Sequence, residues 1–172
     1  MTPLVTTLRR IEACQPCTTG WRKLLRGLGK TTADDEPLPF SAIVEINGLK
    51  DALWCCRAAP EYDRQWRLFA VWCARQVQHQ LTDPRSLAAI DVAERYARGD
   101  ATKHELDVAR AAAYAAGDSV ATAYTAYGRF AFAAAYTAYA VTTCAAYAAY
   151  VADAPLKIKH TEFLRAVNGG EQ

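Results

Sequence analysis

Features that would mark an enzyme or a nucleic-acid-binding protein are scarce in this sequence. Across 172 residues the formal net charge is only +2, whereas proteins that grip nucleic acid usually carry a broad basic footprint. The three histidines, His79, His104 and His160, are scattered among polar positions, and no Ser/His/Asp arrangement is visible. We therefore expect a non-enzymatic protein that needs no cofactor.

A secretory leader and a typical membrane span are also missing. Arg9, Arg10 and Glu12 fall where the apolar core of a signal peptide would lie. Residues 130–152 are uncharged and long enough to cross a bilayer, but they contain no Leu or Ile, and their tyrosines are not confined to the two ends. We expect a cytoplasmic protein in which this stretch is a buried helix.

The six cysteines include one CxxC motif, Cys14 and Cys17, and no second closely spaced pair of that kind. A zinc site would need two further ligands from the scattered cysteines and histidines, and a thioredoxin-type site would need a strand before the motif. We expect free thiols with a structural role. Zinc binding and redox chemistry at Cys14 and Cys17 are the alternatives.

An alanine-rich run at residues 109–152 holds seven of the nine tyrosines. It is written as a near-repeat, Ala-Tyr-Thr-Ala-Tyr at 123–127 and 135–139 and Ala-Tyr-Ala-Ala-Tyr at 146–150. Alanine is the best helix former, and residues three apart share one helical face, so the run predicts tightly packed helices. The tyrosines are expected in the core. An aromatic ligand pocket, or a surface for a partner or a second copy, is the alternative.

The remaining pattern predicts an all-α domain of about seven or eight helices. We expect one domain over residues 1–172, with short N-terminal helices and an acidic Pro loop in 1–60, the main core in 61–152, and a short helix and tail in 153–172. Helical segments are expected at residues 3–13, 21–28, 41–46, 49–59, 61–81, 84–98 and 156–167, and along the run at 102–152, which is expected to break.

Capping signals set several of these boundaries. Asp83 with Pro84 begins one helix and Gly99 ends it. Thr102 and Glu105 form a capping box at the start of the next helix. Gly117, followed by Asp118 and Ser119, is the expected break in the alanine-rich run.

Two charged groups are candidates for binding a partner. Asp34, Asp35 and Glu36 lie in a Pro-containing loop, where they are placed to meet a basic partner. Arg22, Lys23 and Arg26 follow Trp21 on one expected helix and form a local basic face that could contact phosphates.

Part of the chain resembles the alanine-rich helical immunity proteins of bacteria and their phages. The resemblance covers about residues 62–152 and rests on Trp-Cys-Ala-Arg at 72–75, Asp-Pro-Arg-Ser-Leu-Ala-Ala-Ile at 83–90, Ala-Glu-Arg-Tyr-Ala-Arg-Gly at 93–99, Glu-Leu at 105–106 and Ala-Arg-Ala-Ala at 109–112. It implies a small intracellular protein that neutralises another protein, either a toxin or a host defence complex such as a CRISPR effector. No functional residue carries over from that group.

The expected function is therefore that of a non-enzymatic inhibitor that binds a protein target by shape and charge. Its expected contact is the acidic loop, Asp34, Asp35 and Glu36, or the basic face, Arg22, Lys23 and Arg26. A nucleic-acid-binding accessory protein that uses the basic face is one alternative, and a Cys/His metal-binding protein is another.

Overall fold

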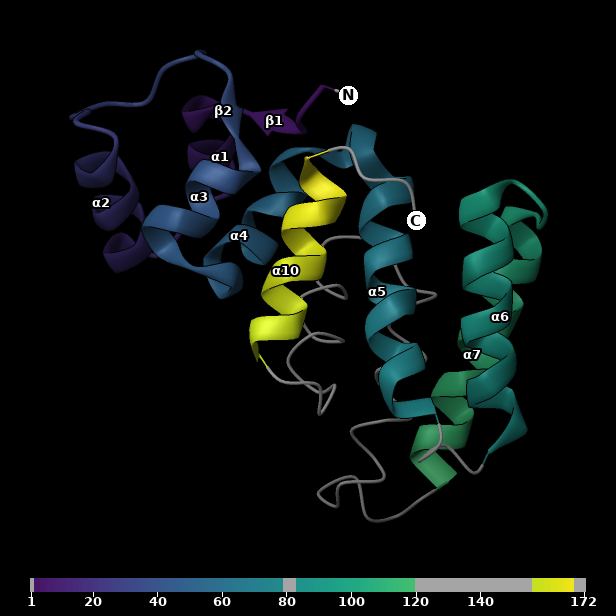
Figure 1. The fold of residues 1–172 in the computed structure, drawn as a ribbon. Coiled ribbons are helices and arrows are strands. Elements are labelled where there is room, and N and C mark those ends of the chain that lie inside the picture. Colours follow the sequence, from purple (N-terminus) through teal and green to yellow (C-terminus); the bar gives the residue numbers. More distant parts are fainter. Residues whose placement is uncertain (1, 79–82, 120–155, 169–172) are drawn as a thin grey trace. The chain divides into compact units, whose positions relative to one another are not determined.

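The fold is all-α, as the sequence predicts. A computed structural model describes residues 2–78, 83–119 and 156–168, and in these ranges it contains eight α-helices, two short 3₁₀ helices and one two-stranded sheet (Figure 1). The contacts divide the chain into two units, residues 1–62 with 160–172 and residues 63–159. The expected single domain stays a prediction.

The first unit begins with a short strand where the sequence predicted a helix. Strand β1 (Val5–Thr6) pairs antiparallel with β2 (Leu38–Pro39). Helix α1 (Leu8–Ala13) starts only after Thr7, whose hydroxyl accepts a hydrogen bond from the Arg10 N–H. The predicted helix over residues 3–13 is thus wrong in its first half, because a partner more than thirty residues away holds that half extended.

Helix α2 (Thr18–Gly27) starts three residues earlier than predicted and packs on α3 (Phe40–Asn47). Helix α3 has no side-chain cap, and it begins one residue before the predicted Ser41 start. Helix α4 (Leu49–Cys55) follows after Gly48, whose φ of 90° lies in the left-handed region that favours glycine. The predicted helix over 49–59 ends early in two 3₁₀ turns, η1 (Cys56–Ala58) and η2 (Pro60–Tyr62).

The C-terminal helix α10 (Leu156–Val167) has the predicted bounds, and its part from His160 onward belongs to the first unit. The backbone N–H of Leu4 donates to the Val167 carbonyl at 2.8 Å, and the Phe40 N–H donates to the Leu4 carbonyl at 3.1 Å. The buried side chains of this unit include Leu8, Ile11, Leu24, Phe40, Ile43, Leu53, Phe163 and Val167. Residues from both ends of the chain therefore complete one core.

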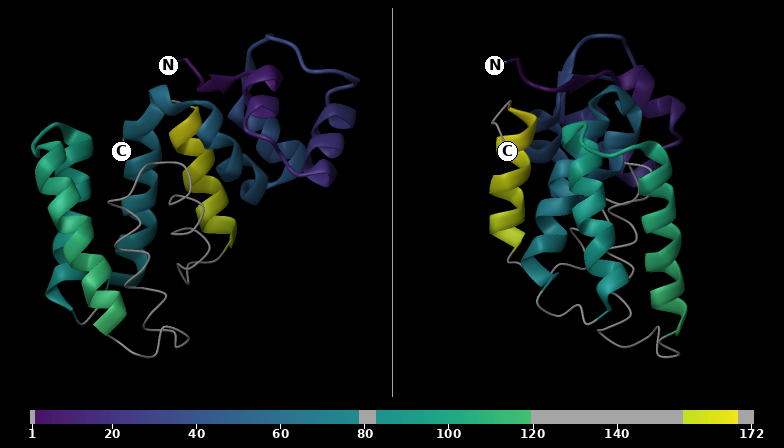
Figure 2. Two further views of the ribbon diagram at one scale, coloured as in Figure 1. Left: turned by 180° about the vertical axis from the view of Figure 1, so that it is seen from behind. Right: turned by 90° about the vertical axis from the view of Figure 1, so that its right-hand side faces the viewer.

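The second unit contains α5 (Asp63–Val77), α6 (Pro84–Arg98) and α7 (Lys103–Ser119). Helix α6 packs against both α5 and α7 (Figure 2). Its bounds are those that Asp83, Pro84 and Gly99 predicted, and Asp83 accepts a hydrogen bond from the Arg85 N–H. The shared core is formed by Val71, Ala74, Ala89, Ile90, Ala93, Leu106 and Ala113.

The start of α7 confirms the capping box. The Glu105 carboxylate accepts a hydrogen bond from the Thr102 N–H at 2.7 Å, and the Thr102 hydroxyl accepts one from the Glu105 N–H at 3.2 Å. The helix passes through Gly117 and reaches Ser119, so the predicted break does not fall at Gly117.

The predicted helices and tyrosine pairs beyond residue 119 lie outside the described residues, as does the uncharged stretch at 130–152. Among the helices that are described, none has the length and apolar character needed to cross a membrane.

Candidate functional site

The acidic loop is tied into the first unit by its own charges. Asp34 and Glu36 both accept hydrogen bonds from the Lys30 ammonium, and Asp35 forms an ion pair with Arg9 at 2.9 Å. A backbone hydrogen bond adds to these ion pairs, because the Arg9 N–H donates to the Asp34 carbonyl at 3.0 Å. The three predicted acidic residues are therefore neutralised within the chain, and the loop is held against α1.

The Lys30 hydrogen bond also sets the protonation of this loop. It lowers the pKa of Asp34, helped by the Glu36 N–H, which donates to the same carboxylate. Nearby, Arg10 makes two hydrogen bonds to Glu61, at 2.6 and 2.7 Å, and they lower the pKa of that carboxyl. Asp34 and Glu61 thus stay ionised at neutral pH and stay paired with Lys30 and Arg10.

The basic face of α2 is arranged differently. Arg22, Lys23 and Arg26 are all exposed, and none of them forms an ion pair with an acid among the residues that the structure describes. They lie within five consecutive residues of one helix, so their charges are close together. Of the two predicted groups, this is the one whose charges remain available to a partner.

Three rows of side chains run along α2, because residues three, four and seven apart fall on one side of a helix. The first row is Gly20, Leu24 and Gly27, and we call it the anchor row. The cation row is Arg22, Lys23 and Arg26. Trp21, Leu25 and Leu28 form the apolar row, in which every side chain is half-buried.

The anchor row lets α2 approach its neighbours closely. A β-carbon at Gly27 would lie 2.4 Å from Ile46 Cγ2, and one at Gly20 would lie 2.9 Å from a carboxylate oxygen of Asp51. The Asn47 amide donates to the Gly20 carbonyl at 2.9 Å and to Asp51 at 2.8 Å. Leu24, between the two glycines, is 2 % exposed. These contacts fix the helix that carries the cation row.

The CxxC motif joins α1 to α2. Cys14 is the C-terminal cap of α1, and Cys17 is the N-terminal cap of α2, with its sulfur accepting from the Gly20 N–H at 3.4 Å. Between them, Gln15 has a left-handed φ of 57°. Both thiols are free, Cys17 is exposed, and within the described ranges no three His, Cys, Asp or Glu side chains form a group that could hold a metal.

Cys55 and Cys56 are buried, whereas two of the histidines are exposed. Burial raises the pKa of the Cys55 thiol to about 12 and raises that of Cys56 well above its ordinary value. These thiols therefore stay protonated and unreactive at neutral pH. His104 and His160 are exposed, as their polar neighbours predicted.

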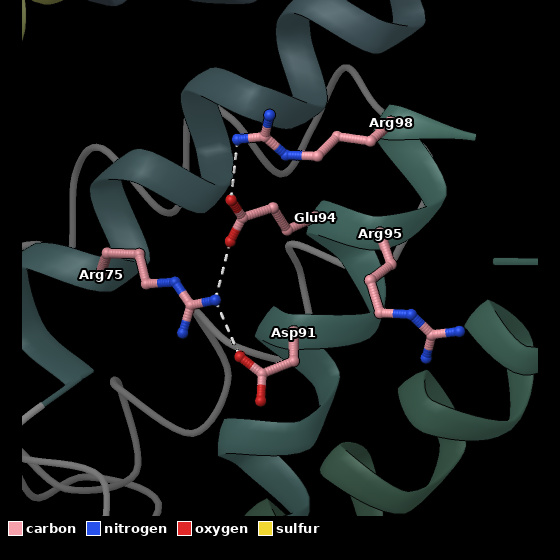
Figure 3. A pocket seen from close by; sticks show the side chains of 5 residues that line it. All are labelled: Arg75, Asp91, Glu94, Arg95 and Arg98. Carbon is pink, nitrogen blue, oxygen red and sulfur yellow. Dashed lines mark hydrogen bonds and ion pairs between the residues drawn. The ribbon is translucent and has the colours of Figure 1, made fainter. Parts of the chain in front are cut away.

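A shallow hollow of about 240 Å³ lies in the second unit, and sequence reasoning did not find it. Its walls are Arg75 of α5 and Asp91, Glu94, Arg95 and Arg98 of α6 (Figure 3). One nitrogen of the Arg75 guanidinium bonds Asp91 at 2.8 Å and Glu94 at 2.7 Å, and Arg98 bonds Glu94 at 3.0 Å.

Four of the five charged side chains in this hollow pair with one another, namely Arg75, Asp91, Glu94 and Arg98. The hydrogen bond from Arg75 lowers the pKa of Glu94, so the carboxylate stays charged. Arg95 turns away toward the end of the helix, where it donates to the Asp100 carbonyl at 2.9 Å. The network links α5 to α6 and is explained by that structural role. The signal in the sequence is the spacing of Asp91 and Glu94, three residues apart on one helical face.

Comparison of this chain with protein-family models, with curated proteins and with solved structures gives no match.

Proposed function

We propose that this protein is a non-enzymatic, intracellular inhibitor of the immunity or anti-defence type, and that it holds an acidic surface of a protein target against α2. The observation that carries the proposal is the cation row: three exposed charges, without acidic partners in the described part of the chain, on a helix fixed by close contacts. Complementary charge steers two proteins together and sets their register.

The acidic loop is the weaker contact, although both groups were candidates. A partner that bound Asp34, Asp35 and Glu36 would have to displace Lys30 and Arg9 first. Within the part of the chain that the structure describes, Arg22, Lys23 and Arg26 have no acidic partner that would have to be displaced. We therefore place the contact on α2 and expect that replacing the three acids with alanine leaves target affinity unchanged.

The test is affinity capture of the tagged protein from a lysate of its natural host, with and without nuclease, followed by mass spectrometry. Wild type should retain one protein in stoichiometric amount whether or not nuclease is present. The variant Arg22→Ala/Lys23→Ala/Arg26→Ala should lose it. Lys50→Ala/Arg64→Ala is a control that removes two exposed cations from elsewhere, and it should retain the target; Arg22→Ala/Arg26→Ala, which removes the same number of charges from α2, should bind less of it.

Nucleic-acid binding is the second candidate, and Trp21 is the observation that favours it. An indole next to arginines on one helix can stack on a base while the cations meet phosphates. Only about three phosphates would be neutralised, so the logarithm of the affinity would fall with the logarithm of salt with a slope of about −2 to −3. If the column retains many proteins and nuclease treatment releases them, the result would support nucleic-acid binding and count against the inhibitor.

A further inference from the structure

Helix α2 has one exposed row and one half-buried row beside it, and together they define what kind of partner surface can bind there. The anchor row already packs inside the first unit, where Gly20 lies against Asp51 and Gly27 lies against Ile46. The cation row and the apolar row remain side by side. The cation row spans residues 22–26, about 6 Å along the axis, and the apolar row spans residues 21–28, about 10 Å. A partner that matches both rows must itself be charged along one edge and apolar along the next.

The cation row has the repeat of a helix. Arg22 and Arg26 are four residues apart, about 6 Å along the axis, and Lys23 lies at the edge of the row, about 100° around the helix from Arg22. Carboxylates four residues apart on a facing helix have the same spacing. Arginine can bind a carboxylate through two parallel hydrogen bonds, so this match fixes orientation as well as charge.

The apolar row decides between a protein and a polynucleotide. Trp21 and Leu25 are four residues apart and half-buried, so each keeps some surface that a partner can cover. Tryptophan and arginine dominate the energetics of protein interfaces. A single strand of nucleic acid would use Trp21 for stacking and would leave Leu25 without a role, and three cations are few for a phosphate backbone.

We infer that α2 is a docking surface for an amphipathic acidic helix of a protein partner, whose carboxylates lie on Arg22 and Arg26 and whose apolar edge lies on Trp21 and Leu25. The inference rests on the proposed function and names the kind of segment that the target presents. Lys23 contributes long-range attraction more than contact energy, because a lysine ammonium is a flexible point charge.

The probe is a labelled synthetic helix of about 18 residues with glutamates at i, i+4 along one edge and leucines along the next. At about 27 Å it is nearly twice as long as α2, so it can cover the whole helix. A scrambled peptide of the same composition destroys both rows without changing charge. A twenty-nucleotide oligothymidine strand represents the polynucleotide. Fluorescence anisotropy measures binding of each probe to the full-length protein at two salt concentrations.

Wild type should bind the patterned peptide about tenfold or more tightly than the scrambled one. Arg22→Ala/Arg26→Ala should weaken that binding by about tenfold or more, and Leu25→Ala should weaken it with little change in salt dependence. Lys50→Ala/Arg64→Ala is again the control and should bind as wild type does. Circular dichroism of each variant checks that the helices are retained.

Equal binding of the two peptides would overturn the inference, because the rows would then not be recognised. Preference for the oligothymidine strand would overturn it in favour of a polynucleotide. Failure to bind either peptide would overturn it too. If capture from the lysate still yields a protein that the α2 triple variant loses, the proposed function survives and only the kind of segment is wrong.

Discussion

Substituting Gly27 with alanine tests whether α2 is as closely packed as the structure describes. Glycine in a helix is usually less stable than alanine by about 0.5–1 kcal/mol, so helix propensity alone predicts that Gly27→Ala stabilises the protein. Packing predicts the opposite. The new methyl carbon would lie 2.4 Å from Ile46 Cγ2 and 3.1 Å from Ile46 Cγ1, whereas unstrained carbon contacts are about 3.5–4.0 Å.

Ile46 cannot easily move aside. Both of its γ-carbons lie within reach of the new methyl, and a β-branched side chain has few χ1 alternatives, so rotation exchanges one clash for another. Overpacking of this kind typically costs about 1–3 kcal/mol. After the gain in helix propensity, we expect Gly27→Ala to lower the free energy of unfolding by about 1–2 kcal/mol.

Urea denaturation followed by circular dichroism measures this change. The double variant Gly27→Ala/Ile46→Ala removes the clash, so the two substitutions should couple favourably by about 1–2 kcal/mol in a double-mutant cycle. Lys23→Ala, at an exposed position of the same helix, should stay within about 0.5 kcal/mol of wild type. If Gly27→Ala proves as stable as wild type, or if no coupling is found, the close approach of α2 and α3 is wrong.

Three further predictions concern caps, thiols and pH. Thr102→Ala should lower the free energy of unfolding by about 0.5–2 kcal/mol by removing the capping hydroxyl, and Thr102→Ser should largely restore it, as thermal melts would record. Cys17 should react with a maleimide at neutral pH much faster than Cys55, whose pKa burial raises to about 12, and peptide mapping that finds equal rates would contradict the burial of Cys55. The hydrogen bond from Lys30 lowers the pKa of Asp34 below its ordinary 3.8, so the stabilisation it provides is present at neutral pH and is lost as the pH falls through that lowered pKa. Melting temperatures of wild type and Asp34→Asn should therefore converge in acid, and a difference that persists at pH 2 would refute this reasoning.

Local signals predicted the elements that local chemistry controls. Asp83, Pro84 and Gly99 set the bounds of α6 correctly, because a cap and a left-handed glycine act on neighbouring backbone groups. The Thr102–Glu105 capping box is equally local, and it was predicted correctly. For such elements the sequence carries the information within four residues.

Contacts between residues far apart in the sequence could not be predicted from such local signals. Val5 is extended because it pairs with Pro39, and no sequence pattern near residue 5 predicts that pairing. The acidic loop was expected to be free, but Asp35 meets Arg9, which lies 26 residues earlier in the chain. The cation row of α2 was predicted as a basic face. Only the structure shows that its three charges lack acidic partners among the described residues, whereas the acidic loop is paired.

The pairing of Leu4 with Val167 has a consequence for the order in which the protein is made. The first unit needs residues 160–168, with Phe163 and Val167 fully buried, yet these residues leave the ribosome after the whole of the second unit. Helices α5, α6 and α7 can pack on one another during translation, because the described residues of their shared core lie between Val71 and Ala113. The first unit, which contains α2, can complete its core only after α10 has been synthesised. A nascent chain would therefore have α5, α6 and α7 packed together before the core of the first unit is complete.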